Sequence, residues 1–227
     1  EFDRAVMNAV ITLNVAGGRD TVTAAAVYKI LNPATTRYPS GRMLEQINKS
    51  LDALMFTPVI IHIPGDYTGD GKVINLKGYL VPAKRATVEI NGKTVDDAMQ
   101  LYETPPLYRF ADCMGQIARP SLKALAVPIN MNSDNVALKS YLTRRVWEMK
   151  RAKSNGKVPK TILWETIYKN MGVPSGSTNA LRLKRGRIRT TALQILDYWR
   201  DCGEIHGYEE TTKGRTAYSV QIQPVYT

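Results

Sequence analysis

In Arg182-Leu183-Lys184-Arg185-Gly186-Arg187-Ile188-Arg189, five of the eight side chains are cationic and none is acidic. The run leads directly into Thr190-Thr191-Ala192-Leu193-Gln194-Ile195-Leu196-Asp197-Tyr198-Trp199. Apolar residues recur across the two runs at helical spacing, namely Ile188, Ala192, Ile195 and Trp199. The sequence therefore predicts an amphipathic helix with cations loaded at its start. Because a helix N-terminus attracts anions through its unpaired N–H groups and its dipole, cations added there favour contact with phosphates.

Two short strands are predicted after this helix. They cover residues 204–208 and 217–222, and the polar turn 209–215 between them contains Lys213 and Arg215. A helix of this kind followed by a hairpin with a basic turn is typical of a winged helix, which is a helix-turn-helix with a β-hairpin wing. The segment therefore favours binding of double-stranded DNA.

The net charge of +11 is distributed unevenly along the 227 residues. Residues 1–132 hold 14 Lys and Arg against 12 Asp and Glu, whereas residues 133–227 hold 17 against 8, a net charge of +9. This bias places the predicted contact with a polyanion in the second part of the chain. No apolar run reaches the roughly 18 residues of a membrane span. We therefore expect a cytoplasmic protein without a membrane partner.

The first part of the chain, residues 1–103, predicts a winged helix of its own. Its expected elements are a helix at 2–15, a strand at 21–22, helices at 24–31 and 40–54, and a hairpin at 59–76. A second hairpin around Asn91-Gly92 elaborates this wing. The pair Asp96-Asp97 that follows is typical of a helix N-terminus.

A connector is predicted at residues 104–132, where prolines separate short helical pieces at 107–113 and 121–126. Residues 133–227 then repeat the order of the first part: a long helix, a strand at 160–162, a helix at 164–171, the basic helix and its hairpin. The predicted fold is therefore α+β, with two winged-helix domains joined by a partly helical connector.

The candidate contacts with DNA lie mainly on the basic helix and the turn after it. In this second domain they are Arg182, Lys184, Arg185, Arg187, Arg189, Thr190, Thr191, Gln194, Lys213 and Arg215. Glycine inside a helix costs about 1 kcal/mol relative to alanine, so the sequence favours a helix that begins near Gly186, after a loop that holds residues 182–185. The simpler interpretation of the cluster is a solvated helix end.

The hypothesis also divides the side chains by role. Arg187, Thr191 and Gln194 are expected to read base edges, and Lys184, Arg185 and Lys213 are expected to contact phosphates. In the first domain, Arg42, Gln46 and Lys49 share the outer face of the third helix. DNA contact and an ordinary exposed face are equally compatible with that weaker pattern.

The sequence offers few residues for catalysis. A nickase or relaxase would need a His-x-His metal pair with a tyrosine nucleophile, yet the two histidines, His62 and His206, are far apart and have no such partner. Cys113 and Cys202 have no metal-ligand spacing, and no phosphate-binding glycine motif is present. We therefore predict a protein that is not an enzyme, without catalytic residues, metal or cofactor.

Four short motifs occur in the order found in a known family. They are Ser140-Tyr141-Leu142, the segment Trp164-Glu165-Thr166-Ile167-Tyr168-Lys169-Asn170-Met171-Gly172, Lys184-Arg185-Gly186-Arg187-Ile188, and Tyr218-Ser219-Val220. With two successive winged helices, the second of them more basic, the chain resembles the replication initiator proteins of bacterial plasmids and related mobile elements. The resemblance implies two winged-helix domains, binding to repeated sites in origin DNA, and a location at the nucleoid. It also implies homodimers and host replication proteins as partners.

Two other functions stay open. A transcriptional regulator of a mobile element would read DNA with the same parts and differ only in the proteins it recruits. An enzyme of the nickase or relaxase class is the third possibility, which the histidine pattern disfavours. The sequence predicts a sequence-specific DNA-binding protein, and replication initiation is its leading role.

Overall fold

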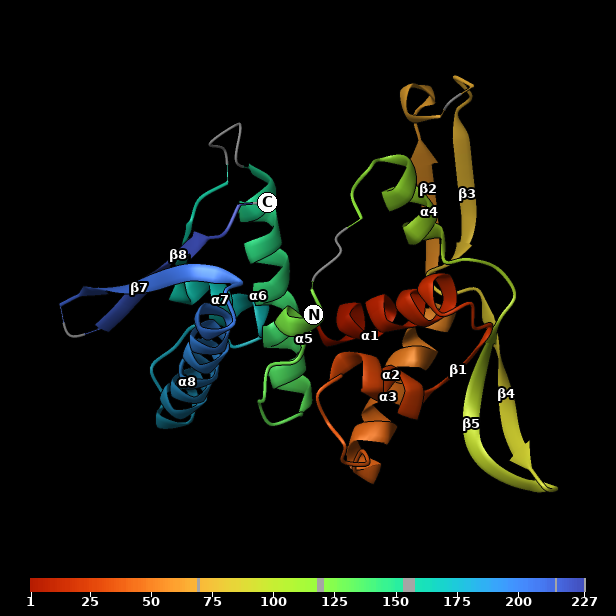
Figure 1. Cartoon of the computed structure of the whole chain (residues 1–227), viewed down its shortest axis with the longest axis horizontal. Helices are drawn as coiled ribbons and strands as arrows, with labels where there is room; N and C mark the ends of the chain where they lie inside the picture. The colour runs from red at the N-terminus through yellow and green to blue at the C-terminus, as the bar shows by residue number, and fades with distance from the viewer. Residues whose placement is uncertain (69, 118–120, 153–157, 215, 227) are drawn as a thin grey trace. The chain divides into compact units, whose positions relative to one another are not determined.

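The computed structural model describes residues 1–68, 70–117, 121–152, 158–214 and 216–226. The protein is a mixed α+β structure with small antiparallel sheets, and it divides into two compact units (Figure 1). We call them the first unit, Asp3–Leu31 and Thr35–Arg119, and the second unit, Pro120–Thr227 with the short pieces Glu1–Phe2 and Asn32–Ala34.

The first unit begins with helices, and side-chain caps mark where two of them start. Its elements up to residue 56 are α1 (Phe2–Ile11), the π-helix η1 (Thr12–Ala16), β1 (Thr21–Thr23), α2 (Ala24–Leu31) and α3 (Gly41–Phe56). The Thr23 hydroxyl accepts from the Ala26 N–H at 3.2 Å, and the Ser40 hydroxyl accepts from the Met43 N–H at 3.3 Å. These bonds satisfy N–H groups that a helix start leaves unpaired, which explains where α2 and α3 begin.

Two hairpins follow α3, and each forms a different sheet. The elements are β2 (Pro58–Ile63), the 3-10 helix η2 (Gly65–Tyr67), β3 (Ile74–Tyr79), β4 (Ala83–Ile90), β5 (Lys93–Leu101) and α4 (Pro106–Cys113). Strands β2 and β3 pair only with each other, whereas β1 joins the second hairpin in the order β1-β5-β4. The turn of that hairpin is Asn91-Gly92, and both residues have positive φ, 54° and 74°.

The expected helix start at Asp96-Asp97 is wrong. Both residues lie within β5, where Asp96 pairs with Val88 and Asp97 with Thr87. Strand β5 continues past these residues because it pairs with β4 on one side and with β1 on the other. Strand β1 lies more than 70 positions earlier in the chain. Pairing at that distance overrides the local preference of two aspartates for a helix start.

The second unit has the same order of helices and strands. Its elements are α5 (Leu122–Leu125), α6 (Ser133–Arg151), β6 (Thr161–Leu163), α7 (Trp164–Asn170), α8 (Asn179–Asp201), β7 (Ile205–Lys213) and β8 (Thr216–Pro224). Its three strands are antiparallel in the order β6-β8-β7. This repeats the arrangement of the first unit, in which the strand before the second helix also pairs with the last strand of a hairpin.

The expected start of the basic helix is corrected by the structure. Helix α8 begins at Asn179, so Gly186 lies inside it and residues 182–185 are helical rather than in a loop. The Thr178 hydroxyl accepts from the Leu181 N–H at 3.3 Å and caps the helix eight positions before Gly186. The cap and the strong helix formers after it outweigh the penalty of one glycine.

The hairpin after α8 is longer than the sequence predicts. Residues 209–213, expected in the turn, continue strand β7, where Thr211 and Ser219 share a hydrogen bond of 2.5 Å between their hydroxyl oxygens. The reversal of the chain is confined to the positions around Gly214, whose φ is 64°. Arg215 lies outside the described residues.

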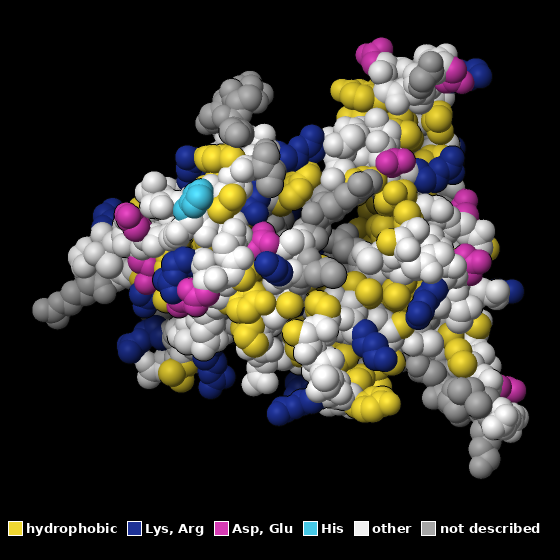
Figure 2. All heavy atoms as spheres, viewed as in Figure 1, with side chains coloured by type: hydrophobic (Ala, Val, Ile, Leu, Met, Phe, Trp, Pro, Cys, Tyr) yellow, Lys and Arg dark blue, Asp and Glu magenta, His cyan; other side chains and the backbone are white. Residues whose placement is uncertain are grey.

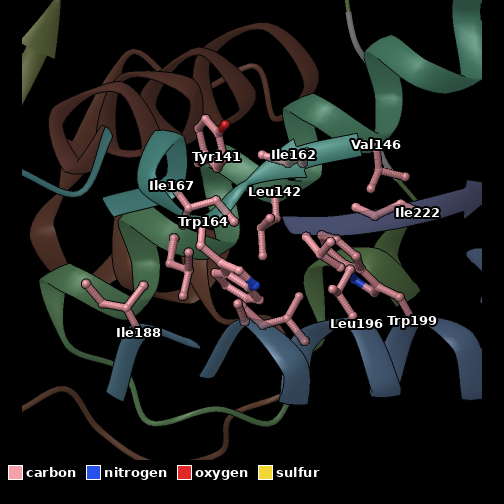
Figure 3. Close-up of a cluster of buried hydrophobic side chains, with 14 of the residues drawn as sticks. Tyr141, Leu142, Val146, Ile162, Trp164, Ile167, Ile188, Leu196, Trp199 and Ile222 are labelled. Atoms are coloured by element: carbon pink, nitrogen blue, oxygen red, sulfur yellow. The ribbon is translucent and has the colours of Figure 1, made fainter. Parts of the chain in front are cut away.

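The core of the second unit lies between its helices and its sheet (Figure 3). Helix α8 contributes the predicted stripe, and the side chains of Ile188, Ala192, Ile195 and Trp199 are all buried. Trp164 of α7 and Leu142 of α6 lie in the same cluster. The spacing of the apolar residues in α8 therefore fixes which of its faces points inward.

Part of the predicted connector belongs to this core. Val127 is 1% exposed within the cluster, and the Trp199 indole N–H donates to the Ala124 carbonyl oxygen at 2.9 Å. The two compact units divide near residue 120, so residues 121–132 pack with the second unit and α4 with the first. A fragment cut at residue 133 would lose these contacts.

We expect the stability of the second unit to rise between about pH 8 and pH 10 because of Lys139. Its side chain is 4% exposed, its ammonium donates to the Leu125 carbonyl oxygen at 3.0 Å, and burial lowers its pKa from the ordinary 10.5 to about 8. Below pH 8 the amine is charged in both states. Above pH 8 the folded state releases a proton that the unfolded chain still holds, so the free energy of unfolding increases by about 1–3 kcal/mol.

The measurement is urea unfolding of the wild type and of Lys139→Met at several pH values in this range. The variant retains every other group that titrates there. Its free energy of unfolding should rise less than that of the wild type. Equal pH dependence in the two proteins would contradict a depressed pKa at Lys139.

Candidate nucleic-acid interface

Helix α8 presents one continuous exposed face away from the core. We call it the outward face, and it consists of Leu183, Gly186, Arg187, Thr190 and Gln194. From one helical turn to the next these positions are three or four residues apart, so they lie on one side of the helix, opposite the buried stripe. Leu183 is 65% exposed although it is apolar. Thr191, expected to read a base, is half-buried on the flank of this face.

Two arginines beside or on the outward face have no acidic neighbour. Arg182 and Arg187 are exposed, and neither forms an ion pair with any residue that the structure describes. The Lys184 ammonium lies 3.8 Å from an Asp134 carboxylate oxygen, and both side chains are exposed. An exposed pair at this distance contributes roughly 0–1 kcal/mol, so Lys184 can exchange its partner for a phosphate at little expense. Figure 2 shows Lys and Arg side chains gathered about the projecting end of α8.

The other two arginines of the cluster are engaged within the second unit. Arg189 donates two hydrogen bonds to the carboxylate of Glu210 on β7, at 2.9 and 2.7 Å, and this contact raises the pKa of Arg189. Arg185 donates to the Pro174 carbonyl oxygen at 3.2 Å, and its guanidinium lies 5.3 Å from the centre of the Tyr168 ring. The two side chains therefore hold α8 against β7 and α7. A role for them at phosphates stays a prediction.

The hairpin β7–β8 carries further charge near its tip. Lys213 is exposed, and its ammonium lies 5.9 Å from the centre of the Tyr218 ring, which is itself half exposed. A cation above an aromatic ring and an exposed ring face are both suited to contact with a nucleic-acid backbone. The described part of the hairpin also carries Glu209 and Glu210, and Glu210 is already paired with Arg189.

The corresponding helix of the first unit, α3, has less uncompensated charge. Arg42 is exposed, Gln46 is half-buried, and the Lys49 ammonium lies 2.6 Å from the Glu45 carboxylate. Further along the helix Asp52 accepts from Arg85 of β4. The charges of α3 thus largely cancel, and DNA contact by Arg42, Gln46 and Lys49 stays a prediction.

The sequence interpretation missed Leu183 and Gly186 as members of the outward face. The predicted helix begins near Gly186, so Leu183 would lie in a loop, where the direction of its side chain is not determined. The available signal was Thr178, whose spacing to Leu181 fits a helix cap. A helix that begins at Asn179 puts Leu183 one turn before Arg187 on the same side.

The two histidines lie in different units. His62 lies on β2, where its Nδ1 is 2.9 Å from the Asn75 side-chain oxygen, and His206 lies on β7 in the second unit. Within the described ranges, no three His, Cys, Asp or Glu side chains come together closely enough to hold a metal ion. None of the helices in the described part of the chain has both the length and the apolar composition needed to cross a bilayer.

No family model, no curated protein and no solved structure gives a significant match to the chain.

Proposed function

We propose that the second unit is a winged-helix domain that binds duplex DNA with the outward face of α8 in the major groove. Two uncompensated cations on or beside that face carry the proposal: Arg182 and Arg187 are exposed and lack an acidic partner among the described residues. An α-helix fits the major groove, which is about 12 Å wide. Lys184 and Lys213 supply further phosphate contacts, and Thr190 and Gln194 present hydrogen-bonding groups toward the bases.

The order of elements supports the winged-helix assignment of both units. Each has helix, strand, two helices and a hairpin, and each pairs its first strand with the last strand of that hairpin. In this assignment β7–β8 is the wing of the second domain and β4–β5 that of the first. The separate hairpin β2–β3 is an insertion between the third helix and the wing.

For the biological role, we propose initiation of replication at repeated origin sites of a bacterial plasmid or mobile element, without enzymatic activity. The four motifs that resemble replication initiators support this choice over a transcriptional regulator. Three of them fall on α6, α7 and α8, and the fourth on β8. The role would involve the nucleoid, host replication proteins and pairing of two copies of the chain.

The DNA-binding proposal is tested by a salt titration of the full chain. With three or four phosphate contacts, the affinity for random-sequence duplex DNA should fall by roughly 50- to 100-fold between 50 and 200 mM salt, because each contact releases condensed counterions. Fluorescence anisotropy measures this directly. Absence of binding at 50 mM salt, or an affinity that does not depend on salt, would contradict the proposal.

Mapping the DNA bound in cells distinguishes the two roles. An initiator should occupy tandem repeats next to a replication origin. A regulator should occupy promoter operators and leave the origin empty.

A further inference from the structure

Gly186 lies inside the longest described helix, and no contact with the rest of the described chain requires a glycine there. It is exposed, it is not among the residues with positive φ, and a Cβ atom built on it meets no atom within 4 Å. A side chain would therefore fit without strain. Three glycines of the second unit, by contrast, have an internal reason, since Gly172, Gly203 and Gly214 all have positive φ.

The glycine also weakens the helix that contains it. Glycine has more backbone freedom to lose on folding than any other residue, so alanine at the same position favours α8. A residue that the fold neither needs nor benefits from points to a requirement outside the chain. The neighbouring side chains indicate what that requirement is.

Gly186 lies on the outward face, on the side that borders Arg182. Arg182 precedes it and Thr190 follows it by one helical turn, and Arg187 is adjacent. The guanidiniums of Arg185 and Arg189, on the flank of this face, bind to α7 and β7 and do not cover Gly186. The helix backbone is therefore bare at this point, between cations that project on either side.

We infer that Gly186 is the position at which α8 and duplex DNA approach most closely, with the glycine Cα against the DNA. The inference rests on the proposed DNA binding. A methyl group at this point would hold the helix away from the groove and lengthen the hydrogen bonds of Arg187, Thr190 and Gln194, which weaken steeply as geometry degrades. The absence of a side chain is thus a determinant of affinity, and Leu183 on the same face is placed to contact a thymine methyl group.

The test is Gly186→Ala in the full chain, with both stability and DNA affinity measured. The melting temperature should rise by roughly 2–8 °C, because alanine favours the helix. The affinity for the best duplex found should fall by about tenfold or more, because several groove contacts lengthen together. Gly186→Leu should weaken binding further. A substitution that damages the fold lowers both the melting temperature and the DNA affinity. A higher melting temperature together with a lower affinity therefore indicates close approach of the helix to DNA.

Gly41→Ala is the matched control. Gly41 is an exposed glycine at the start of α3 with open space about its Cβ, and it lies in the first unit. This variant should bind DNA as the wild type does. If Gly186→Ala also binds like the wild type, the inference is overturned, and it is equally overturned if Gly186→Ala lowers the melting temperature. If the wild type itself fails to bind duplex DNA, the proposed function fails, and that result is distinct from either of the others.

Discussion

Replacement of Trp199 by alanine is expected to destabilise the second unit strongly. The side chain is 1% exposed in the middle of the core, and its indole N–H donates to the Ala124 carbonyl oxygen at 2.9 Å. Removal of a buried tryptophan costs about 3–5 kcal/mol through lost burial and the cavity left behind. Since a domain of this size is stable by roughly 5–15 kcal/mol, the loss is a large part of the margin.

Urea unfolding followed by circular dichroism measures the effect, with Trp147→Ala as the control. Trp147 lies on α6 and is only partly buried, with the Arg151 guanidinium 4.9 Å from its ring centre. Its removal leaves a smaller cavity and should cost clearly less. A loss below about 1 kcal/mol for Trp199→Ala would mean that the inward face of α8 is misassigned.

Loss of the outward cations is expected to have the largest effect on DNA affinity. In the triple variant Arg182→Ala, Lys184→Ala, Arg187→Ala, affinity for random duplex DNA at about 0.1 M salt should fall by roughly 100-fold or more, because three cations of α8 no longer displace counterions from the DNA. Stability should change little, since these side chains are exposed and Lys184 has only a distant partner. Fluorescence anisotropy gives the affinities, and circular dichroism shows that the variant is folded.

A control with the same change of net charge separates a local contact from general attraction. Lys29, Lys77 and Lys84 are exposed cations of the first unit, and their replacement by alanine removes the same three charges. This variant should lose little affinity. Equal losses in the two variants would mean that DNA responds to the total charge of the chain and not to α8.

The helix that carries the candidate interface could be predicted from sequence because its evidence is local. Ile188, Ala192, Ile195 and Trp199 recur at helical spacing, and all four are buried. The predicted start of the same helix was wrong, because the prediction considered the glycine penalty at Gly186 and not the cap at Thr178. A cap and a run of helix formers together exceed one unfavourable residue.

The sheets were predicted less well because strand pairing depends on residues far apart in sequence. The hairpin of β2 and β3 was recognised, yet the partner of β1 proved to be β5, at least 75 positions later. Local alternation identifies a strand and leaves its neighbour undetermined. The ion pair of Arg189 with Glu210 likewise joins residues that are apart in sequence. The sequence of the basic cluster alone therefore did not reveal which of its arginines face outward.

The most direct test of the account compares the salt dependence of DNA binding by the wild type and by the triple variant Arg182→Ala, Lys184→Ala, Arg187→Ala. Affinities for one random-sequence duplex are measured by anisotropy at several salt concentrations between about 50 and 200 mM. If these three cations of α8 displace counterions when they contact the DNA, the slope of log affinity against log salt should be shallower by about 3 in the variant. Slopes that are equal in the two folded proteins would contradict the assignment of α8 as the DNA-binding helix.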